Sequence, residues 1–203
     1  MKLVFATNNK HKLEEVRQIL PPVYDILSLS DIGFTGEIEE NGDTLEANSM
    51  LKVRCVTDWL KARGKDMPDG VFADDTGLEV AALGGAPGVH TARYAGEPAN
   101  DAANRRKLLE ELRKTGTADR RACFRTVVTL ERNGRTEQAE GRVNGTIATE
   151  EHGAGGFGYD SLFIPQGGQR CFAELTANEK NSISHRGRAM EELRKLLSEA
   201  QTS

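Results

Sequence analysis

Apolar and polar residues follow two different periods along this chain, and the period changes from one segment to the next. Residues 2–6 form an almost continuous apolar run, which predicts a buried strand. From about Lys10 to Leu20 the apolar residues recur every three or four positions, which predicts a helix. The polar segment Thr7-Asn8-Asn9 joins the two, and Pro21-Pro22 ends the helix. The chain is therefore expected to begin with a strand, a polar turn and a helix.

Strands and helices are expected to alternate through the rest of the first half. The expected elements are a strand at 24–27, a helix from about 44 to 63, a strand at 70–73 and a helix at 99–114. Asp43 or Thr44 is suited to cap the long helix. The basic residues 105–107 of the last helix are interpreted as a solvated face.

The second half of the chain changes to an antiparallel pattern. Strand-like residues 122–131 and 136–145 flank Asn133-Gly134, a strong signal for a hairpin turn. A further strand at 161–164 and a final helix from about Ser184 to 199 complete the chain. This pattern predicts one domain over residues 1–203, built from two lobes. The first lobe is expected at about residues 1–120 plus 160–203, and the second at about 121–159.

Composition and charge exclude several classes of protein. The chain has 203 residues and a net charge of −4, so a strongly basic footprint for nucleic acid is absent. No apolar run approaches the roughly 20 residues that span a bilayer. The three cysteines, Cys55, Cys123 and Cys171, are widely separated, which disfavours a zinc site or a disulfide framework. We expect a cytoplasmic protein with no nucleic-acid or membrane partner.

Two segments have the composition of an anion site and a metal site. Thr7-Asn8-Asn9 lies at a helix N-terminus, where unpaired N–H groups favour an anion, and Lys10 and Lys12 add positive charge. Ordinary helix capping with surface lysines is the alternative. Glu39-Glu40 precedes the long helix and Asp74-Asp75 follows a strand, so hard oxygen ligands for a metal are available. Dipole-favoured acids and an Asp-rich turn are the alternatives for these pairs.

A glycine-rich loop carries the aromatic residues that a flat ligand needs. Gly155-Gly156-Phe157-Gly158-Tyr159-Asp160 combines a permissive backbone with two rings and a carboxylate. Such a loop suits a nucleobase, although aromatics that only fill the core are an open alternative. Farther along, Lys180, His185 and Arg186 form a second cationic group.

In this order, the motifs resemble those of the inosine/xanthosine triphosphate pyrophosphatase family over nearly the whole chain. The matching segments are Thr7-Asn8-Asn9 with Lys12, Glu39-Glu40, Asn48 with Lys52, Asp74-Asp75-Thr76-Gly77-Leu78, Gly156–Asp160 and Ser184-His185-Arg186. The resemblance implies an α/β fold with an elongated mixed sheet in two lobes and a central cleft, of the ITPase-like, anticodon-binding-like α/β/α type. It also implies a homodimer and a Mg²⁺ requirement. The implied reaction is hydrolysis of ITP, dITP or XTP to the monophosphate and pyrophosphate.

Residue roles follow from the same resemblance. The implied triphosphate-binding residues are Thr7, Asn8, Asn9, Lys10, His11 and Lys12, and Thr76 stands where the family often has Ser. Asp75 and Lys52 are the implied catalytic residues, and Asp75 with Glu40 or Glu39 is the implied Mg²⁺ site. Asp75 as general base and a metal-activated water are competing accounts. The implied base pocket consists of Phe157, Gly158, Tyr159, Asp160, Lys180, His185 and Arg186.

Two other functions remain consistent with these motifs. One is a related nucleotide pyrophosphatase with a different base preference. The other is a non-catalytic nucleotide sensor. Four carboxylates near phosphate argue against a sensor, because an anion binder gains little from them unless a divalent metal lies among them.

Overall fold

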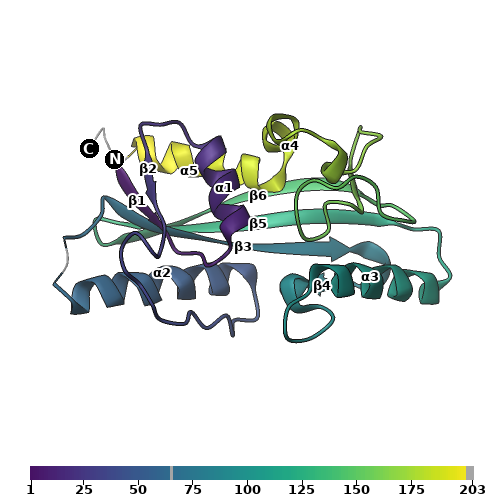
Figure 1. Ribbon diagram of the computed structural model, residues 1–203, viewed down its shortest axis with the longest axis horizontal. Helices are drawn as coiled ribbons and strands as arrows, with labels where there is room; N and C mark the ends of the chain where they lie inside the picture. Colours follow the sequence, from purple (N-terminus) through teal and green to yellow (C-terminus); the bar gives the residue numbers. More distant parts are fainter. Residues whose placement is uncertain (65, 200–203) are drawn as a thin grey trace. The chain divides into compact units, whose positions relative to one another are not determined.

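The computed structural model describes residues 1–64 and 66–199, which form a mixed α/β fold (Figure 1). Six strands follow one another in the sheet in the order β2-β1-β3-β5-β6-β7, and β4 pairs with β3. β1 runs parallel to β2 and β3, whereas β3 pairs antiparallel with β4 and β6 with β7. The strands are β1 (Lys2–Phe5), β2 (Asp25–Leu27), β3 (Gly70–Val80), β4 (Pro87–Gly88), β5 (Arg121–Arg132), β6 (Arg135–Ile147) and β7 (Phe163–Pro165).

Side-chain caps begin the helices at the polar residues that precede them. Asn9 accepts a hydrogen bond from the Lys12 N–H at 3.1 Å, and Thr44 accepts one from the Ala47 N–H at 3.1 Å. Thr44, rather than Asp43, is therefore the cap of the long helix. The α-helices are α1 (Lys10–Ile19), α2 (Leu45–Ala62), α3 (Asp101–Thr115), α4 (Ala177–Ile183) and α5 (His185–Glu199). Short 3₁₀ turns occupy Ala81–Leu83, Thr91–Arg93 and Phe172–Glu174.

The chain folds into two compact units. Among the described residues, unit 1 comprises those within 1–75, 126–141 and 186–199, and unit 2 comprises residues 76–125 and 142–185. β3, β5 and β6 each contribute residues to both units. These boundaries differ from those of the expected lobes, because each long strand packs with different helices along its length. The hairpin was expected in the second lobe, whereas its tip belongs to unit 1.

Unit 1 has a core on each face of its part of the sheet, and the strand period assigns residues to one or the other. Leu3 and Phe5 of β1 pack with α1 and α5, whereas Val4 and Ala6 pack with α2. In β3, Phe72 shares the first core, and Ala73 shares the second. Figure 1 shows α1 and α5 on one side of these strands and α2 on the other. Such continuous burial is typical of parallel strands.

Unit 2 has one apolar core under α3. Leu108 and Leu112 of α3 pack in the same cluster as Leu78, Phe124 and Phe163. The rings of Phe124 and Phe163 lie 4.7 Å apart between centroids. Tyr159 is also buried in this cluster. The glycine-rich loop is therefore anchored in the unit 2 core.

The structure corrects two expectations for local structure. β3 does not end at Asp74 but continues to Val80, because the buried aspartates are paired with cations and do not need to leave the strand. α4 was not expected and immediately precedes α5. The predicted hairpin is confirmed, with Asn133 and Gly134 at positive φ values of 51° and 74°. Within the described residues, no helix has the length and apolar composition to cross a membrane.

Candidate active site

Asp74 and Asp75 lie on opposite faces of β3. Adjacent residues of a strand alternate between faces, so Asp74 shares the face of Phe72, and Asp75 shares the face of Ala73. Both are buried, with 1% and 7% of their surface exposed. β1 ends at Phe5, opposite Phe72, so the aspartates lie just beyond the carboxyl end of β1. The two carboxylates therefore do not form one pair. Each contacts side chains of the helices that cover its own face of the strand.

On the α2 face, Asp75 forms an ionic group with Lys52 and Glu40. Lys52 Nζ lies 3.0 Å from Asp75 Oδ1, 2.8 Å from Glu40 Oε2 and 3.0 Å from the Asp74 carbonyl oxygen. Burial opposes the charge of Lys52, but the carboxylates of Asp75 and Glu40 outweigh it and raise its pKa. We call Lys52, Asp75 and Glu40 the α2-face group.

Asn48 orients the α2-face group from the first turn of α2. Its Nδ2 donates to Asp75 Oδ2 at 3.2 Å, and its Oδ1 accepts from the Gly42 N–H at 2.8 Å. One turn along the helix, Lys52 lies on the same side, as the spacing of four residues requires. Asn48 therefore connects Asp75 to the acidic loop that carries Glu40.

On the other face, Asp74 joins α1 to α5. Its Oδ1 accepts from Lys12 Nζ at 2.9 Å, and its Oδ2 accepts from Arg186 Nε at 3.0 Å. Arg186 also donates from Nη1 to Glu15 Oε2 at 2.5 Å. Burial alone would raise the pKa of Asp74, but the charges of Lys12 and Arg186 hold it well below its usual range. Burial lowers the pKa of Lys12, and the attraction of Asp74 offsets only part of that effect.

The N-terminus of α1 brings the expected phosphate-binding residues together. Thr7 Oγ1 accepts from the Asn9 N–H at 3.1 Å, and Asn9 caps the helix. Asn8, Lys10 and His11 are exposed at the same end. The first turn contains no acidic residue, so it keeps the positive potential of the helix end.

The oxygen donors on the α2 face fit a magnesium ion. Mg²⁺ is usually held by one or two carboxylates together with substrate phosphates and water. Asp75 and Glu40 already converge on one cationic nitrogen, so their oxygens share a region that favours positive charge. Glu39 instead accepts from Asn41 Nδ2 at 3.3 Å. The described residues contain no cluster of three or more His, Cys, Asp or Glu arranged for a metal.

In unit 2, the glycine-rich loop is folded around Asp160. Asp160 Oδ2 accepts from the Phe157 N–H at 2.9 Å and from Lys180 Nζ at 2.6 Å. Gly156 has a φ of 69°, and a Cβ there would collide with Asp160 Oδ2. Asp160 therefore braces the loop.

The two aromatic residues of the loop have different environments. Phe157 is partly exposed, and Lys180 Nζ lies over its ring, 5.1 Å from the centroid. Tyr159 is buried, and its hydroxyl donates to the Thr91 carbonyl at 3.0 Å. Burial raises the pKa of Tyr159. The ring of Phe157 is thus presented by the loop, whereas the Tyr159 side chain is used in packing.

The remaining predicted residues divide between the units. His185 is buried in unit 2 and stacks on Phe124, with ring centroids 4.5 Å apart. Arg186, the next residue, belongs to unit 1. Thr76 begins the unit 2 part of β3 and is partly buried. The residues expected in the base pocket, apart from Arg186, therefore belong to unit 2.

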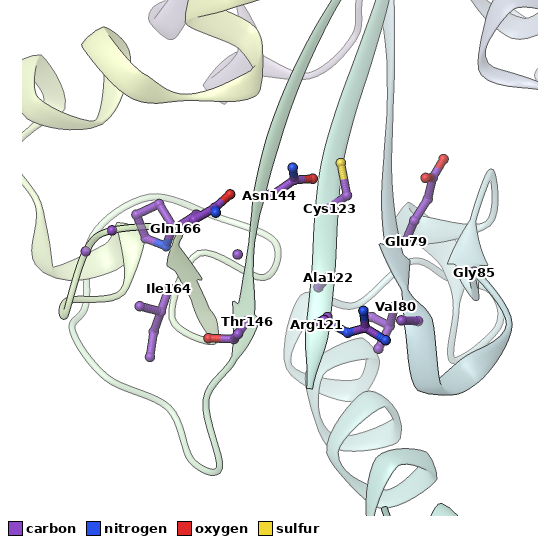
Figure 2. A pocket seen from close by; sticks show the side chains of 15 residues that line it. Glu79, Val80, Gly85, Arg121, Ala122, Cys123, Asn144, Thr146, Ile164 and Gln166 are labelled. Carbon is purple, nitrogen blue, oxygen red and sulfur yellow. The ribbon is translucent and has the colours of Figure 1, made fainter. Parts of the chain in front are cut away.

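A hollow of about 810 Å³ lies on unit 2. Figure 2 shows Glu79, Cys123 and Asn144 along its wall, on β3, β5 and β6 respectively. None of the residues that line it belongs to the motifs of the sequence analysis. The hollow and the predicted site are different features of the protein.

Sequence reasoning missed several residues that support the site. Glu15 pairs with Arg186, and Asp101 and Arg105 both contact Gly158. The interpretation of residues 105–107 as a solvated face is wrong for Arg105, which has backbone and side-chain partners, and for Lys107, which donates to the Tyr94 carbonyl oxygen. A signal was available in the spacing of Asp101 and Arg105, four residues apart on one helix face. Their partners are far along the chain and could not be read from that spacing.

Comparison with known proteins tests the resemblance that the motifs suggested. The model of the Ham1 family matches residues 3–196. A dITP/XTP pyrophosphatase of Porphyromonas gingivalis is 52% identical, with 97% of each chain covered, and one of Bacillus subtilis is 45% identical, with 96% of each covered. The solved structure of the Staphylococcus aureus Ham1 protein aligns with a TM-score of 0.84 and 37% identity, covering 98% of this chain and 100% of that one. The resemblance inferred from the motifs is confirmed, and the chain belongs to the Ham1 family.

Proposed function

We propose that this protein hydrolyses ITP, dITP and XTP to the nucleoside monophosphate and pyrophosphate. The observation that carries the proposal is the α2-face group, in which Asp75, Lys52 and Glu40 converge within hydrogen-bond distance. Two acids and a lysine in that arrangement suit a water nucleophile and an anionic substrate. The relatives at 52% and 45% identity are dITP/XTP pyrophosphatases, which supports dITP and XTP as substrates.

The triphosphate is proposed to bind at the N-terminus of α1. N–H groups at the start of a helix bind phosphate oxygens, and α1 begins at Lys10 with Asn9 as its cap. Lys12 is within 2.9 Å of Asp74, which holds its ammonium near this end. Lys52 supplies a second cation from α2. Both lysines act as point charges that offset the phosphate charge.

The bond change takes place at the α-phosphorus. The oxygen of a water molecule bonds to that phosphorus, and the bond from it to the oxygen bridging to the β-phosphorus breaks, so pyrophosphate leaves with the bonding electrons. Asp75 orients the water and receives its proton. Lys52 and Asn48 fix the Asp75 carboxylate at 3.0 Å and 3.2 Å, which prevents it from rotating away.

Magnesium is proposed as the cofactor, with Asp75 and Glu40 as its protein ligands. When bound, Mg²⁺ offsets charge on the phosphate oxygens and lowers the pKa of a coordinated water. Glu40 is favoured over Glu39, because only Glu40 is directed to Lys52 and Asp75. Thr76 follows Asp75 in β3 and offers a hydroxyl for a phosphate oxygen.

The base is proposed to stack on Phe157. Hypoxanthine, xanthine and guanine carry an oxygen acceptor at position 6, whereas adenine carries an amino donor there. Guanine differs from hypoxanthine by an amino group at position 2, so a pocket with no room or acceptor at that position excludes it. Donors on His185 and Arg186 would satisfy that oxygen and leave adenine facing a donor. Rejection at a site built around a hydrogen bond reaches about 10⁴-fold.

The first test is pyrophosphate release from ITP, XTP, GTP and ATP, with Mg²⁺ and with EDTA. We expect Mg²⁺-dependent pyrophosphate release from ITP and XTP. Release from GTP and ATP should be at least about 100-fold slower. No release from ITP or XTP would contradict the proposed reaction. Equal release from all four would contradict the proposed base selection and leave a general pyrophosphatase.

Two further properties belong to this proposal. A homodimer is proposed from the family resemblance and is tested by light scattering coupled to size-exclusion chromatography. A cytoplasmic location is proposed from the acidic net charge of −4 and from three widely separated cysteines, which form no disulfide in the described part of the chain. A monomer mass or recovery in a secreted fraction would contradict these two statements respectively.

A further inference from the structure

Two side chains of helix α3 form hydrogen bonds with the backbone N–H and carbonyl oxygen of Gly158, in the glycine-rich loop. Asp101 Oδ2 accepts from the Gly158 N–H at 2.8 Å, and Arg105 Nη1 donates to the Gly158 carbonyl oxygen at 2.9 Å. The N–H belongs to the peptide plane shared with Phe157, and the carbonyl belongs to the plane shared with Tyr159. The two contacts therefore fix two successive peptide planes, one on each side of Gly158.

The backbone conformation at Gly158 makes this support necessary. Gly158 has a φ of 62°, in the left-handed region, and nothing lies within 4 Å of the place where a Cβ would be. No atom packs against Gly158 at that position, and glycine itself is conformationally permissive. The hydrogen bonds from α3 restrain the backbone of Gly158 directly, in addition to the packing of Tyr159 beside it.

α3 is a rigid support for these two side chains. Asn100 caps it by accepting from the Ala103 N–H at 2.9 Å. Asn104 is buried and bonds the backbone of Ala95 at 2.7 Å and of Ala92 at 2.9 Å. Leu108 lies in the core of unit 2. Asp101 and Arg105, at i and i+4, thus project from a helix that is fixed along its length.

Arg105 also fixes the flanks of the loop. Its Nε donates to Glu151 Oε2 at 2.8 Å, and Ser161 Oγ donates to the same oxygen at 3.0 Å. Burial would raise the pKa of Glu151, but Arg105 and Ser161 lower it below its usual value. One guanidinium therefore connects residues before, within and after the loop.

From this geometry we propose that Asp101 and Arg105 are positioning residues for the purine base. They hold Gly158, and through it the adjacent Phe157, in the orientation that receives the base, and they do not touch the substrate. The proposal rests on the proposed function, since it names the residues that set base selection at that same site. Asp160 and Lys180 restrain the other side of Phe157, so the ring is held from two directions.

The decisive variants are Arg105→Ala and Asp101→Ala, with Arg106→Ala as the matched control. Arg106 is the next residue of α3 and is exposed. We expect the first two variants to lose about 10- to 100-fold in kcat/KM for ITP, mainly through KM, and to show a smaller ratio of ITP to GTP turnover. Arg105→Lys should recover part of the loss, because lysine can still donate to the Gly158 carbonyl. Arg106→Ala should match the wild type.

Hydrogen exchange of the peptide covering residues 153–160 measures the loop without any turnover. We expect faster exchange in Arg105→Ala and Asp101→Ala and an unchanged rate in Arg106→Ala. Exchange equal to that of the control would overturn the proposal. So would faster exchange with an unchanged ITP-to-GTP ratio, since α3 would then hold the loop without serving the base. If a variant is not folded, Arg105→Lys and Asp101→Asn take its place in both measurements.

The same design separates this proposal from the proposed reaction. If the wild type releases no pyrophosphate, the reaction is wrong, and calorimetric binding of IMP replaces turnover. IMP binding that weakens in Arg105→Ala but not in Arg106→Ala would then support the positioning role. An absence of IMP binding to the wild type would overturn that role together with the reaction.

Discussion

The charged cluster of unit 1 and the glycine-rich loop of unit 2 are organised in opposite ways. In unit 1, side chains from three helices converge on two buried aspartates, and every contact described there joins charged or amide groups. In unit 2, side chains form hydrogen bonds with the backbone of the glycine-rich loop, which presents the aromatic ring of Phe157. Unit 1 thus brings charged side chains together, and unit 2 fixes the position of an aromatic ring. Under the proposed function, the charged cluster serves the phosphates of a nucleotide, and the ring serves its base.

This difference predicts how substitutions in each region should act. A change in the unit 1 cluster should reduce turnover of every triphosphate by a similar factor, because all triphosphates carry the same phosphates. A change at the loop should act unequally on different bases. The following variants test that division, beginning with the largest expected effect.

Asp75→Asn should reduce kcat by about 10²–10⁴-fold for ITP and XTP alike, because it removes the group proposed to accept the proton. Asn is nearly isosteric and can still accept from Asn48 or Lys52, so the fold should survive. Steady-state kinetics and circular dichroism measure the two effects. Asp58→Asn, at an exposed position of α2, is the control. Turnover within twofold of the wild type would refute the role of Asp75.

Asp74→Asn should destabilise the protein by about 3–5 kcal/mol, because it leaves Lys12 and Arg186 buried without their shared anion. The folded-state pKa of Asp74 is lowered from 3.8. Its contribution to stability is therefore complete above the unfolded pKa and is lost as the pH falls through the folded value.

Urea denaturation at pH 7 and near pH 3 tests this linkage. The difference in the free energy of unfolding between wild type and Asp74→Asn should be largest at pH 7 and should shrink on acidification. Asp58→Asn again provides the control. A difference that grows as the pH falls would contradict the assignment of Asp74 as a buried, ionised partner.

Phe157→Ala should raise KM for ITP by about 5- to 150-fold, which corresponds to the 1–3 kcal/mol of one base–aromatic contact. Phe157→Leu keeps apolar bulk without a ring face and should recover only part of the loss. Hydrolysis of inorganic tripolyphosphate, which has no base, provides the comparison: a similar loss with that substrate would show that the loop affects the phosphates. The division between the two regions would then be wrong.

Glu40→Gln and Glu39→Gln form a matched pair with a smaller expected effect. Glu40→Gln should increase the Mg²⁺ concentration needed for half-maximal activity by about tenfold or more. Glu39→Gln should leave it unchanged, because Glu39 is directed to Asn41 rather than to Lys52. Magnesium titrations of the initial rate measure both. An equal increase in this Mg²⁺ concentration in both variants would contradict the assignment of Glu40, rather than Glu39, as the ligand.

Local signals in the sequence were sufficient for much of the fold. The α1 helix, a side-chain cap at Asp43 or Thr44 and the hairpin at Asn133-Gly134 each depend on residues a few positions apart, and all were predictable; the structure assigns the cap to Thr44. The convergence of Lys52 with Asp75 was not, since it depends on the register of α2 against β3. Family resemblance indicated these residues, but spacing alone did not place them together.

The missed features share one physical cause. Arg105 was assigned to solvent because its neighbours in sequence are polar, yet its partners Glu151 and Gly158 lie 46 and 53 residues away. The continuation of β3 past Asp74 was missed because buried aspartates are unfavourable unless paired. Their partners come from three helices, so no local pattern could reveal that these partners offset the unfavourable free energy of burying the aspartates.

The alternation of β3 makes the two aspartates non-interchangeable. Deleting one residue from the strand between Gly70 and Ala73 would shift the following side chains by one position and turn each to the opposite face. The carboxylate now beside Lys52 would then be presented to α1, and its neighbour would be presented to α2. The sequence would still contain both acids, but each carboxylate would face the cations that now pair with the other. The length of this strand segment is therefore a constraint as strict as the identity of any residue in the cluster.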